Sequence, residues 1–458
     1  MDTKQLRQKV LDLAIRGKLV PQNPNDEPAS VLLERIREEK ERQIKEGKIK
    51  RDTKEKTGDK FPYQNVPFEV PEGWVWVKVK DIGEVVTGNT PSKDNKENYG
   101  NDYPFYKPTD LEQGISVTKA SDNLSLSGYS KARQLPVFSI LVTCIGATIG
   151  KTGLILKEGT CNQQINAIIP NSSIEYKFLY YSCISDYFQN QIEENASATT
   201  LPIINKSKFE QLLFSLPPLA EQKLIIQKIE EYFALIDQIE DNKLSLFQFI
   251  KQTKSKVLDL AIRGKLVPQD PNDEPASVLL EKIRNERKEK NPASDNSHYP
   301  FEAPKGWAIC SLSHISKTIS SKPFQILQSE IITEGKIPVV SQSINIVEGY
   351  SNNSEKSLEV TTPLIIFGDH TRIVKYIDFN FIVGADGVKI IKPNNIYPKY
   401  FYYLLLYVSH KIEDRGYSRH FQFIEKFPLA IPPLAEQHRI VQKIESIFRT
   451  LDSTQNNL

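Results

Sequence analysis

The chain contains a near-exact internal copy of itself, and this repeat limits the possible folds more than any other feature. Lys9–Arg37 (KVLDLAIRGKLVPQNPNDEPASVLLERIR) recurs as Lys256–Arg284 with two changes in 29 positions, at an offset of 247 residues. Pro217–Asp237 matches Pro432–Asp452 at 13 of 21 positions, but here the offset is 215 residues. The two offsets sum to 462, and the chain has 458 residues. If the N- and C-termini were joined, the chain would therefore form a closed ring of two repeats that is short by only 4 residues. A cyclic duplication of this kind predicts an approximate two-fold axis within one chain.

The composition is that of an ordinary globular protein. Apolar residues make up 39% and charged residues 25% of the 458 residues, and this length predicts two to four domains. No apolar run approaches the roughly 20 residues of a membrane-spanning helix, and the N-terminal segment does not resemble a signal peptide. The four cysteines show no CxxC pairing, which favours reduced thiols. We therefore expect a soluble, cytoplasmic protein with no membrane partner.

The charge gives no strong sign of a nucleic-acid partner. The net charge is +2, whereas nucleic-acid-binding proteins often carry a marked basic excess. If DNA is the partner, either the basic residues are gathered on one face or other subunits supply part of the phosphate contact.

Both repeats have the pattern of helices that pack in pairs. From Ile225 onward, nine of eleven positions spaced alternately four and three residues apart are apolar or tyrosine, with Lys243 and Thr253 as the exceptions. This period of 3.5 residues is typical of coiled coils. The predicted seam comprises Ile225, Ile229, Tyr232, Ile236, Ile239, Leu246, Ile250, Val257 and Leu260, then Ile440, Ile444, Ile447, Leu451 and Leu458 in the C-terminal copy, and Leu6, Val10 and Leu13 at the N-terminus.

The limits of these helices are also marked in the sequence. Proline pairs at Pro217-Pro218 and Pro432-Pro433 predict helix starts, because proline fits the first turn but not the interior. Gly17 and Gly264 stand where a helix C-cap is expected. The central helix is therefore predicted over residues 219–263.

The segments between the helices scarcely resemble each other. They open alike, with PFEVPEGW at Pro67–Trp74 and PFEAPKGW at Pro300–Trp307, and each opening precedes an alternating apolar pattern typical of a strand. Ile140–Ile149 and Leu364–Phe367 are predicted to hold short buried strands among loops. We expect an α+β fold in which two mixed α/β domains are separated by long antiparallel coiled-coil helices. The predicted division is 1–60 (helix and linker, charged and solvated at 34–60), 61–215 (first domain), 216–297 (central helical spacer), 298–430 (second domain) and 431–458 (C-terminal helix).

This arrangement resembles the specificity subunit of type I restriction–modification enzymes over essentially the whole chain. The resemblance rests on the two PPLAEQ segments, Pro217–Gln222 and Pro432–Gln437, and on the duplicated LDLAIRGKLVPQ of Leu11–Gln22 and Leu258–Gln269. Further family-like stretches are Gly146–Gly153 with Asn162-Gln163 in the first domain, and Phe367–Arg372 with Gly384–Ile390 in the second.

The resemblance implies a function for the repeat. Each target-recognition domain would bind one half of a bipartite, asymmetric double-stranded DNA site through the major groove, and the helices would set the gap between the halves. Two methyltransferase subunits carrying S-adenosylmethionine would bind the helices and methylate adenine. Two restriction and translocase subunits would add ATP-driven, magnesium-dependent cleavage. This chain itself would bind no cofactor.

Two glycine or proline motifs suggest chemistry, but each lacks a required part. Gly146–Gly153 lacks the GxxxxGK[ST] spacing of a phosphate loop, because Ile145 stands where the first glycine is needed. The proline pairs lack the polar residue and the aromatic ring that flank such a pair in amino-methyltransferases.

The carboxylates and histidines are equally incomplete. Asp378, Asp386 and Lys389 lack the usual spacing of a magnesium-dependent nuclease, and the six histidines form no metal-ligand pattern. We therefore predict no catalytic residue and no metal site. The alternatives are a self-contained DNA methyltransferase or nuclease, and a coiled-coil scaffold that does not bind DNA.

Candidate DNA-contacting residues are polar or basic side chains in the loops of the two domains, the types that donate to base edges and phosphates. For any one of them, an ordinary solvated surface residue is the competing interpretation. The candidates are Lys107, Thr109, Arg133, Gln134, Lys151, Asn162 and Gln163 in the first domain, and Gln342, Ser343, Asn345, His370, Arg372, Arg415, Arg419 and His420 in the second.

Overall fold

The structure is a computed structural model that describes residues 2–47, 66–197, 201–287, 302–384, 386–416 and 418–457. The chain divides into two compact units, Met1–Asn242 and Lys243–Leu458, and the boundary falls within helix α8 (Leu219–Ile262). Each unit therefore joins one domain to helices that precede and follow it in sequence. Part of the predicted linker, residues 48–60, and the first residues of both predicted domains lie outside the described residues.

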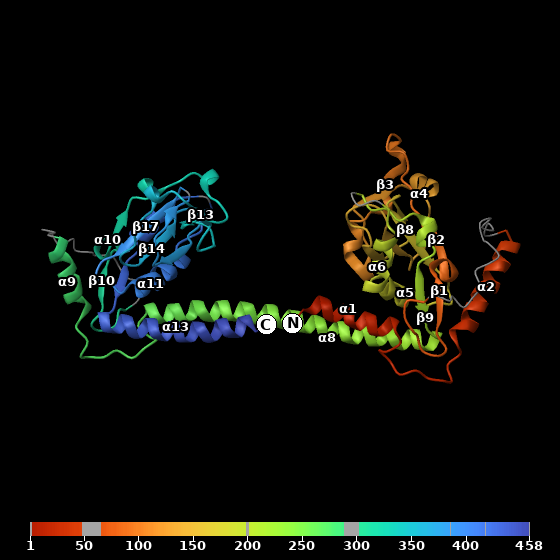
Figure 1. Cartoon of the computed structure of the whole chain (residues 1–458), viewed down its shortest axis with the longest axis horizontal. Coiled ribbons are helices and arrows are strands. Elements are labelled where there is room, and N and C mark those ends of the chain that lie inside the picture. The colour runs from red at the N-terminus through yellow and green to blue at the C-terminus, as the bar shows by residue number, and fades with distance from the viewer. Residues whose placement is uncertain are drawn as a thin grey trace. The chain divides into compact units, whose positions relative to one another are not determined.

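The helices of each unit form an antiparallel pair. In the first unit, α1 (Thr3–Ile15) lies along the first part of α8, and Arg7 pairs with Asp237 while Gln22 bonds to Glu221. In the second, the last part of α8 lies along α13 (Leu434–Asn456), where Lys254 pairs with Asp452 and Gln269 bonds to Glu436. In both pairs, the residue numbers of one segment decrease as those of its contact partners increase, so each pair is antiparallel (Figure 1).

The predicted helix limits are confirmed. Helix α8 begins at Leu219 and α13 at Leu434, directly after the proline pairs. Gly17 and Gly264 end their helices with φ +65° and +66°. The N–H of the following lysine bonds back to the carbonyl of Leu13 or Leu260 at 2.8 Å, the geometry of a Schellman cap.

The predicted seam follows the buried side of the helices with one exception. Ile225, Ile229, Ile236, Ile250, Val257, Ile440 and Ile444 are buried, while Ile239, Leu246, Leu260, Ile447, Leu451, Leu6, Val10 and Leu13 are half-buried. Tyr232 is the exception, with 38% of its surface exposed. Its neighbour Phe233 packs instead, against Tyr181 of the domain. Each helix contacts both its partner helix and the domain, so its apolar face is wider than a two-helix seam. The last seam position, Leu458, lies outside the described residues.

The first domain, residues 75–216, consists of three small sheets. A four-stranded antiparallel sheet has the order β2-β8-β5-β6, a three-stranded sheet the order β4-β3-β7 with β3 and β7 parallel, and β1 pairs with β9. The strands are β1 (Val75–Lys78), β2 (Gly83–Thr87), β3 (Tyr99–Tyr106), β4 (Asp122–Leu124), β5 (Ile140–Thr143), β6 (Thr152–Leu154), β7 (Thr160–Cys161), β8 (Ile165–Pro170) and β9 (Leu213–Leu216). The helices are α3 (Val79–Ile82), α4 (Leu126–Lys131), α5 (Tyr176–Cys183), α6 (Asp186–Asn195) and α7 (Lys206–Phe209).

The second domain, residues 308–431, repeats this topology strand for strand despite its different sequence. Its sheets have the orders β11-β17-β14-β15, β13-β12-β16 with β12 and β16 parallel, and β10-β18. The strands are β10 (Ala308–Cys310), β11 (Ser316–Ile319), β12 (Ile337–Val340), β13 (Gly349–Ser351), β14 (Leu364–Gly368), β15 (Val374–Ile377), β16 (Ile382–Val383), β17 (Val388–Pro393) and β18 (Leu429–Ile431). The helices are α10 (Leu312–Ile315), α11 (Pro398–Lys411) and α12 (Phe421–Glu425). The predicted pair of mixed α/β domains of one fold is confirmed.

One further helix flanks each domain, α2 (Ala29–Lys45) and α9 (Ala276–Arg287). Leu32, Leu33 and Ile36 of α2 enter the same hydrophobic core as Leu11 of α1 and Ile225 of α8. Within the described ranges, no helix is both long and apolar enough to cross a membrane.

Candidate nucleic-acid interface

Each domain is anchored to its helix pair by a buried glutamate of the PPLAEQ segment. Glu221 accepts hydrogen bonds from Trp74 Nε1 at 2.8 Å and from Gln22 Nε2 at 2.9 Å. Glu436 accepts the same two bonds from Trp307 and Gln269, both at 3.0 Å. Burial raises the pKa of both carboxyl groups. In each unit, one glutamate at the start of a long helix thus contacts both the tryptophan that precedes the first strand of the domain and the glutamine in the loop after the capping glycine.

The glutamine that follows makes a second repeated anchor. Gln222 donates to the Pro217 carbonyl at 3.0 Å and accepts from the N–H of Glu175 at 3.1 Å. Gln437 bonds in the same way to Pro432 at 3.0 Å and to the N–H of Tyr397 at 2.9 Å. An ion pair at 2.6 Å also recurs, between Lys177 and Glu230 and between Lys399 and Glu445. Each domain is therefore held on its helices by one set of contacts, although the domains differ elsewhere.

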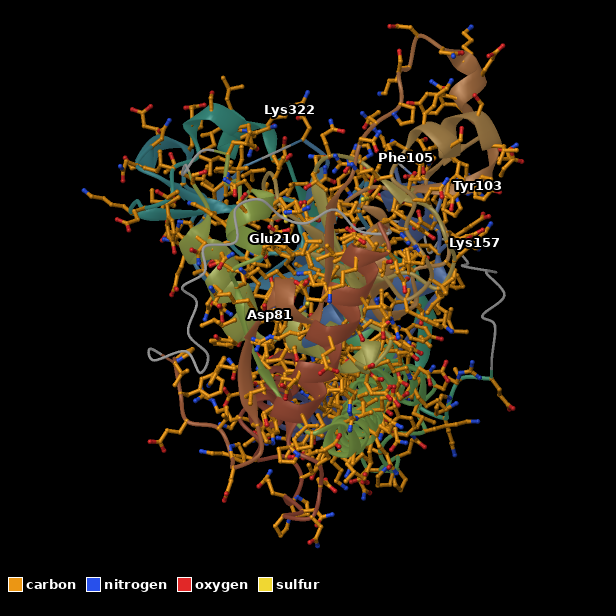
Figure 2. The ribbon with its side chains drawn as sticks, turned by 90° about the vertical axis from the view of Figure 1, so that its right-hand side faces the viewer. Asp81, Tyr103, Phe105, Lys157, Glu210 and Lys322 are labelled. Carbon is orange, nitrogen blue, oxygen red and sulfur yellow. The ribbon has the colours of Figure 1, made fainter. Side chains whose placement is uncertain are left out.

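Some of the loops that carry the DNA candidates leave the carboxyl ends of the parallel strand pairs. Tyr106 of β3 is the partner of Cys161 of β7, so Lys107 and Asn162 follow side by side. In the second domain, Val340 of β12 is the partner of Val383 of β16, and Gln342 lies just beyond. Figure 2 shows Tyr103 and Phe105 of β3 farther up than Asp81 of α3, on the part of the first domain away from its helix pair.

In the first domain, four polar residues from three loops come together, of which Arg133 and Gln163 are exposed while Asn89 and Thr90 are half-buried. The Arg133 guanidinium donates to the Thr87 carbonyl at 2.6 Å, and the main-chain N–H of Arg133 donates to Asn89 Oδ1 at 2.8 Å. Thr90 donates to Gln163 Oε1 at 2.5 Å. Arg133 and Gln163 were predicted from the sequence, whereas Asn89 and Thr90 were missed. Their only sequence signal is their position directly after a strand, since β2 ends at Thr87.

The other first-domain candidates differ in whether their side chains already form ion pairs within the domain. Lys107 forms an ion pair with Asp122, and Lys151 forms one with Glu112 at 2.9 Å. Thr109 and Gln134 are exposed. The two lysines would have to leave their carboxylates to neutralise phosphates.

In the second domain, Gln342 is the centre of the candidate site. Its Nε2 donates to the Asp386 carbonyl at 3.1 Å, and its Oε1 accepts from the His370 N–H at 3.2 Å. The His370 ring in turn lies 3.2 Å from the Ser418 carbonyl. Four loops thus converge at one place, compared with three in the first domain.

The arginines of this domain lie beside the same loops. Arg372, with φ +60°, donates to the Ile412 carbonyl at 3.1 Å and to Asp414 at 2.5 Å. Arg415 is exposed, lies over the Phe423 ring at 4.8 Å and pairs with Glu413 at 3.0 Å. Arg419 is also exposed.

Two candidates must be corrected. His420 is 0% exposed, its Nδ1 lies 3.0 Å from the Asp369 carbonyl, and its Nε2 accepts from the Arg415 N–H at 3.2 Å. Its main-chain N–H bonds to Asp369, the residue after β14, just as the buried Ile204 bonds to Cys144 after β5. His420 therefore occupies a core position of the fold and cannot reach a base in this arrangement.

Asn162 is the second correction. Its side chain is buried, its Nδ2 donates to Gln164 Oε1 at 2.9 Å, and its Oδ1 accepts from the Gln164 N–H at 3.1 Å. Both ends of the amide are therefore used to shape the turn after β7. The adjacent exposed Gln163 is the residue that the turn presents to solvent.

Comparison with known proteins identifies the family. The profile of the family described as "Type I restriction modification DNA specificity domain" matches residues 71–246 and 304–458. The chain belongs to this family. The specificity subunit of the type I restriction enzyme EcoAI from Escherichia coli is 30% identical over 414 residues, covering 76% of this chain and 68% of that protein. The EcoEI specificity subunit from Escherichia coli is 24% identical over 553 residues, covering 99% of this chain and 90% of that protein.

Solved structures share the fold. One, from a study titled "Structural basis underlying complex assembly and conformational transition of the type I R-M system", has a TM-score of 0.59 at 17% identity, over 85% of this chain and 94% of that one. The HsdS subunit from Thermoanaerobacter tengcongensis has a TM-score of 0.51 at 16% identity, over 85% and 93%. This chain is thus the DNA sequence-specificity subunit of a type I restriction–modification system, with DNA and other subunits as its partners.

The specificity subunit is non-catalytic, in line with the incomplete motifs. Among the described residues, no group of three His, Cys, Asp or Glu could hold a metal. Lys389 lies 3.6 Å from Asp369, while Asp386 accepts a bond from Gln325 at 2.8 Å, so these groups serve the loop structure. Gly146 and Gly150 shape the β5–β6 turn with φ +97° and +85°.

Proposed function

We propose that each domain of this specificity subunit reads one half of a bipartite, asymmetric DNA site in the major groove, with the helices setting the gap. The observation that carries the proposal is the combination of one topology with two different sets of loop residues. Arg133, Asn89 and Gln163 converge in the first domain, whereas Gln342 and His370 converge in the second, with Arg372 on the same loop as His370. Hydrogen-bonding side chains of these types discriminate base pairs in the major groove, so different sets select different half-sites.

The repeated helical segments suit two copies of one partner. The identical anchors at Glu221 and Glu436 hold each helix pair in the same way against its domain, so the exposed faces of the helices would offer equivalent surfaces to two methyltransferase subunits, each placed to methylate one adenine. Two restriction and translocase subunits would then join the complex. In this assembly, which we place in the cytoplasm, S-adenosylmethionine, ATP and magnesium are held by the partner subunits and this chain binds no cofactor.

Adenine-methylation sequencing tests the proposal. A host free of adenine methylation receives the neighbouring methyltransferase gene with or without this gene. We expect methylation at one bipartite motif only when this chain is present. Unchanged methylation would refute the recognition role and favour the scaffold alternative.

A domain exchange tests the division of labour. Residues 308–431 are replaced by the corresponding segment of another specificity subunit, with the Trp307–Glu436 contact kept intact. We expect one half of the motif to change while the other half and the gap remain. If both halves change together, the two domains do not read independently.

A further inference from the structure

The loop between β12 and β13 holds two isoleucines out in solvent. The Ile344 side chain belongs to a residue that is 84% exposed, and Ile346 is 58% exposed. They stand in the sequence SQSINIVE at residues 341–348, among polar side chains. Exposed single apolar residues are common on protein surfaces, so the loop around them decides whether these two have a role.

A buried lysine of the same domain forms hydrogen bonds to the main chain of that loop. Lys375 of β15 is 4% exposed, and its Nζ donates to the main-chain carbonyl of Ser341 at 2.8 Å and to that of Asn345. Glu348 accepts from the Ser341 hydroxyl at 3.0 Å and from the Ser343 hydroxyl. Burial lowers the pKa of Lys375 to about 8. These bonds fix the loop in a form that keeps the isoleucines exposed, so the exposure is built into the fold.

The loop is continuous with the candidate DNA interface. Gln342 starts it and bonds to the loops at His370 and Asp386. In Figure 1, β13, which ends the loop, lies in the part of the second domain away from its helix pair. The corresponding β3–β4 connection of the first domain has no such residues, because its Leu111 and Val117 are buried and its Ile115 packs against the core. The isoleucines are therefore a property of the second domain alone.

We propose that Ile344, flanked by Ile346, reads a thymine in the half-site of the second domain by packing against its C5-methyl group. The inference rests on the proposed function and names one contact within it. An isoleucine side chain can neither donate nor accept a hydrogen bond, and the thymine methyl is the apolar group that the major groove displays. Rigid presentation by Lys375 avoids ordering the loop at the moment of binding.

Replacing thymine by deoxyuridine tests the contact, because it removes only the methyl group. The methyltransferase complex containing the full chain is bound to duplexes of its own motif, with each thymine of the second half-site replaced in turn. One replacement should weaken binding by the wild type about fourfold, the effect of burying one methyl-sized group. I344S should lose affinity for the thymine duplex and show no further loss with deoxyuridine, while I344V should retain part of the discrimination.

The first half-site supplies an internal control, since its deoxyuridine profile should be the same for wild type and I344S. If the wild type tolerates deoxyuridine at every thymine of the second half-site, the inference is wrong although specific binding persists. If I344S weakens binding while its discrimination between thymine and deoxyuridine is unchanged, the isoleucine acts otherwise, for example as a wedge between base pairs, and the methyl contact is refuted. A wild-type complex that binds its motif no better than scrambled DNA overturns the proposed function itself.

Discussion

Trp74 and Glu221 are joined by a hydrogen bond of 2.8 Å across 147 residues of sequence, and Trp307 and Glu436 repeat it at 3.0 Å. In each case a second bond comes from Gln22 or Gln269, whose amide also bonds to the carbonyl of the capping glycine at 2.7 Å. The duplicated segments are thus alike because each forms the same joint between a recognition domain and its helices. The domains are free to differ where they do not touch that joint.

The first prediction concerns the glutamate of this joint. Both oxygens of Glu221 accept from donors, so in Glu221→Gln the new amide NH₂ must face either Trp74 Nε1 or the Gln22 amide. A buried donor without an acceptor costs about 1–3 kcal/mol, so the midpoint of thermal unfolding should fall. Glu231→Gln is the control, because Glu231 is an exposed residue of the same helix that pairs with Lys228. Equal effects of the two changes would contradict the structural role of Glu221.

The capping glycines give a second prediction. In Gly17→Ala the residue would have to keep φ +65°, and its Cβ would lie 2.4 Å from Pro71 Cγ. The backbone alone costs about 1–2 kcal/mol, and the overlap adds to it. Gly47→Ala is a matched control, since Gly47 has φ +72° and nothing lies within 4 Å of the added Cβ. Chemical denaturation should show a clearly larger loss for Gly17→Ala than for Gly47→Ala.

The buried lysine of the second domain predicts a pH dependence. The pKa of Lys375 is lowered from 10.5 to about 8 by burial. Between these values the unfolded chain holds this proton and the folded chain does not, so raising the pH through this window favours folding. The free energy of unfolding of the wild type, relative to Lys375→Met, should therefore rise from pH 8 to pH 10. Lys336→Met, which removes an exposed lysine of the same domain, controls for the loss of one charge.

His420 and its neighbour Arg419 should behave in opposite ways. His420→Ala removes a buried ring and two polar contacts, so unfolding should become about 2–4 kcal/mol easier while the methylated motif stays the same. Arg419→Ala should change stability by less than about 0.5 kcal/mol. If Arg419 contacts DNA, its removal should weaken binding by about 1–3 kcal/mol. Thermal unfolding and duplex binding of both variants distinguish the roles, and a changed motif in a stably folded His420→Ala would show that His420 takes part in recognition.

The helical architecture could be predicted from the sequence because its determinants are local. The 3.5-residue apolar period, the proline pairs and the glycine caps each act within a few residues, and α8 begins at Leu219 as they predict. The repeat itself predicted two domains of one fold, and both show the same strand order. The prediction that Tyr232 lies on the seam was wrong because a 3.5-residue period describes the face that packs against one partner helix. This helix also packs on the domain, through Phe233.

The interface depended on contacts that only the tertiary structure makes. Polarity selected Arg133 and Gln342 and equally selected His420 and Asn162, because residue type does not say which side of a loop faces the core. The folded structure distinguishes them, because His420 beside β14 and Asn162 after β7 are buried, whereas Arg133 and Gln342 are not. The exposed Ile344 was not among the candidates, since an apolar residue in a sequence suggests a core position. Its exposure depends on Lys375, 31 positions later in the sequence, whose Nζ bonds hold the loop open. Sequence alone therefore determined the helices and the duplication through local periodicity, and long-range packing decided which loop side chains are buried and which are presented to solvent.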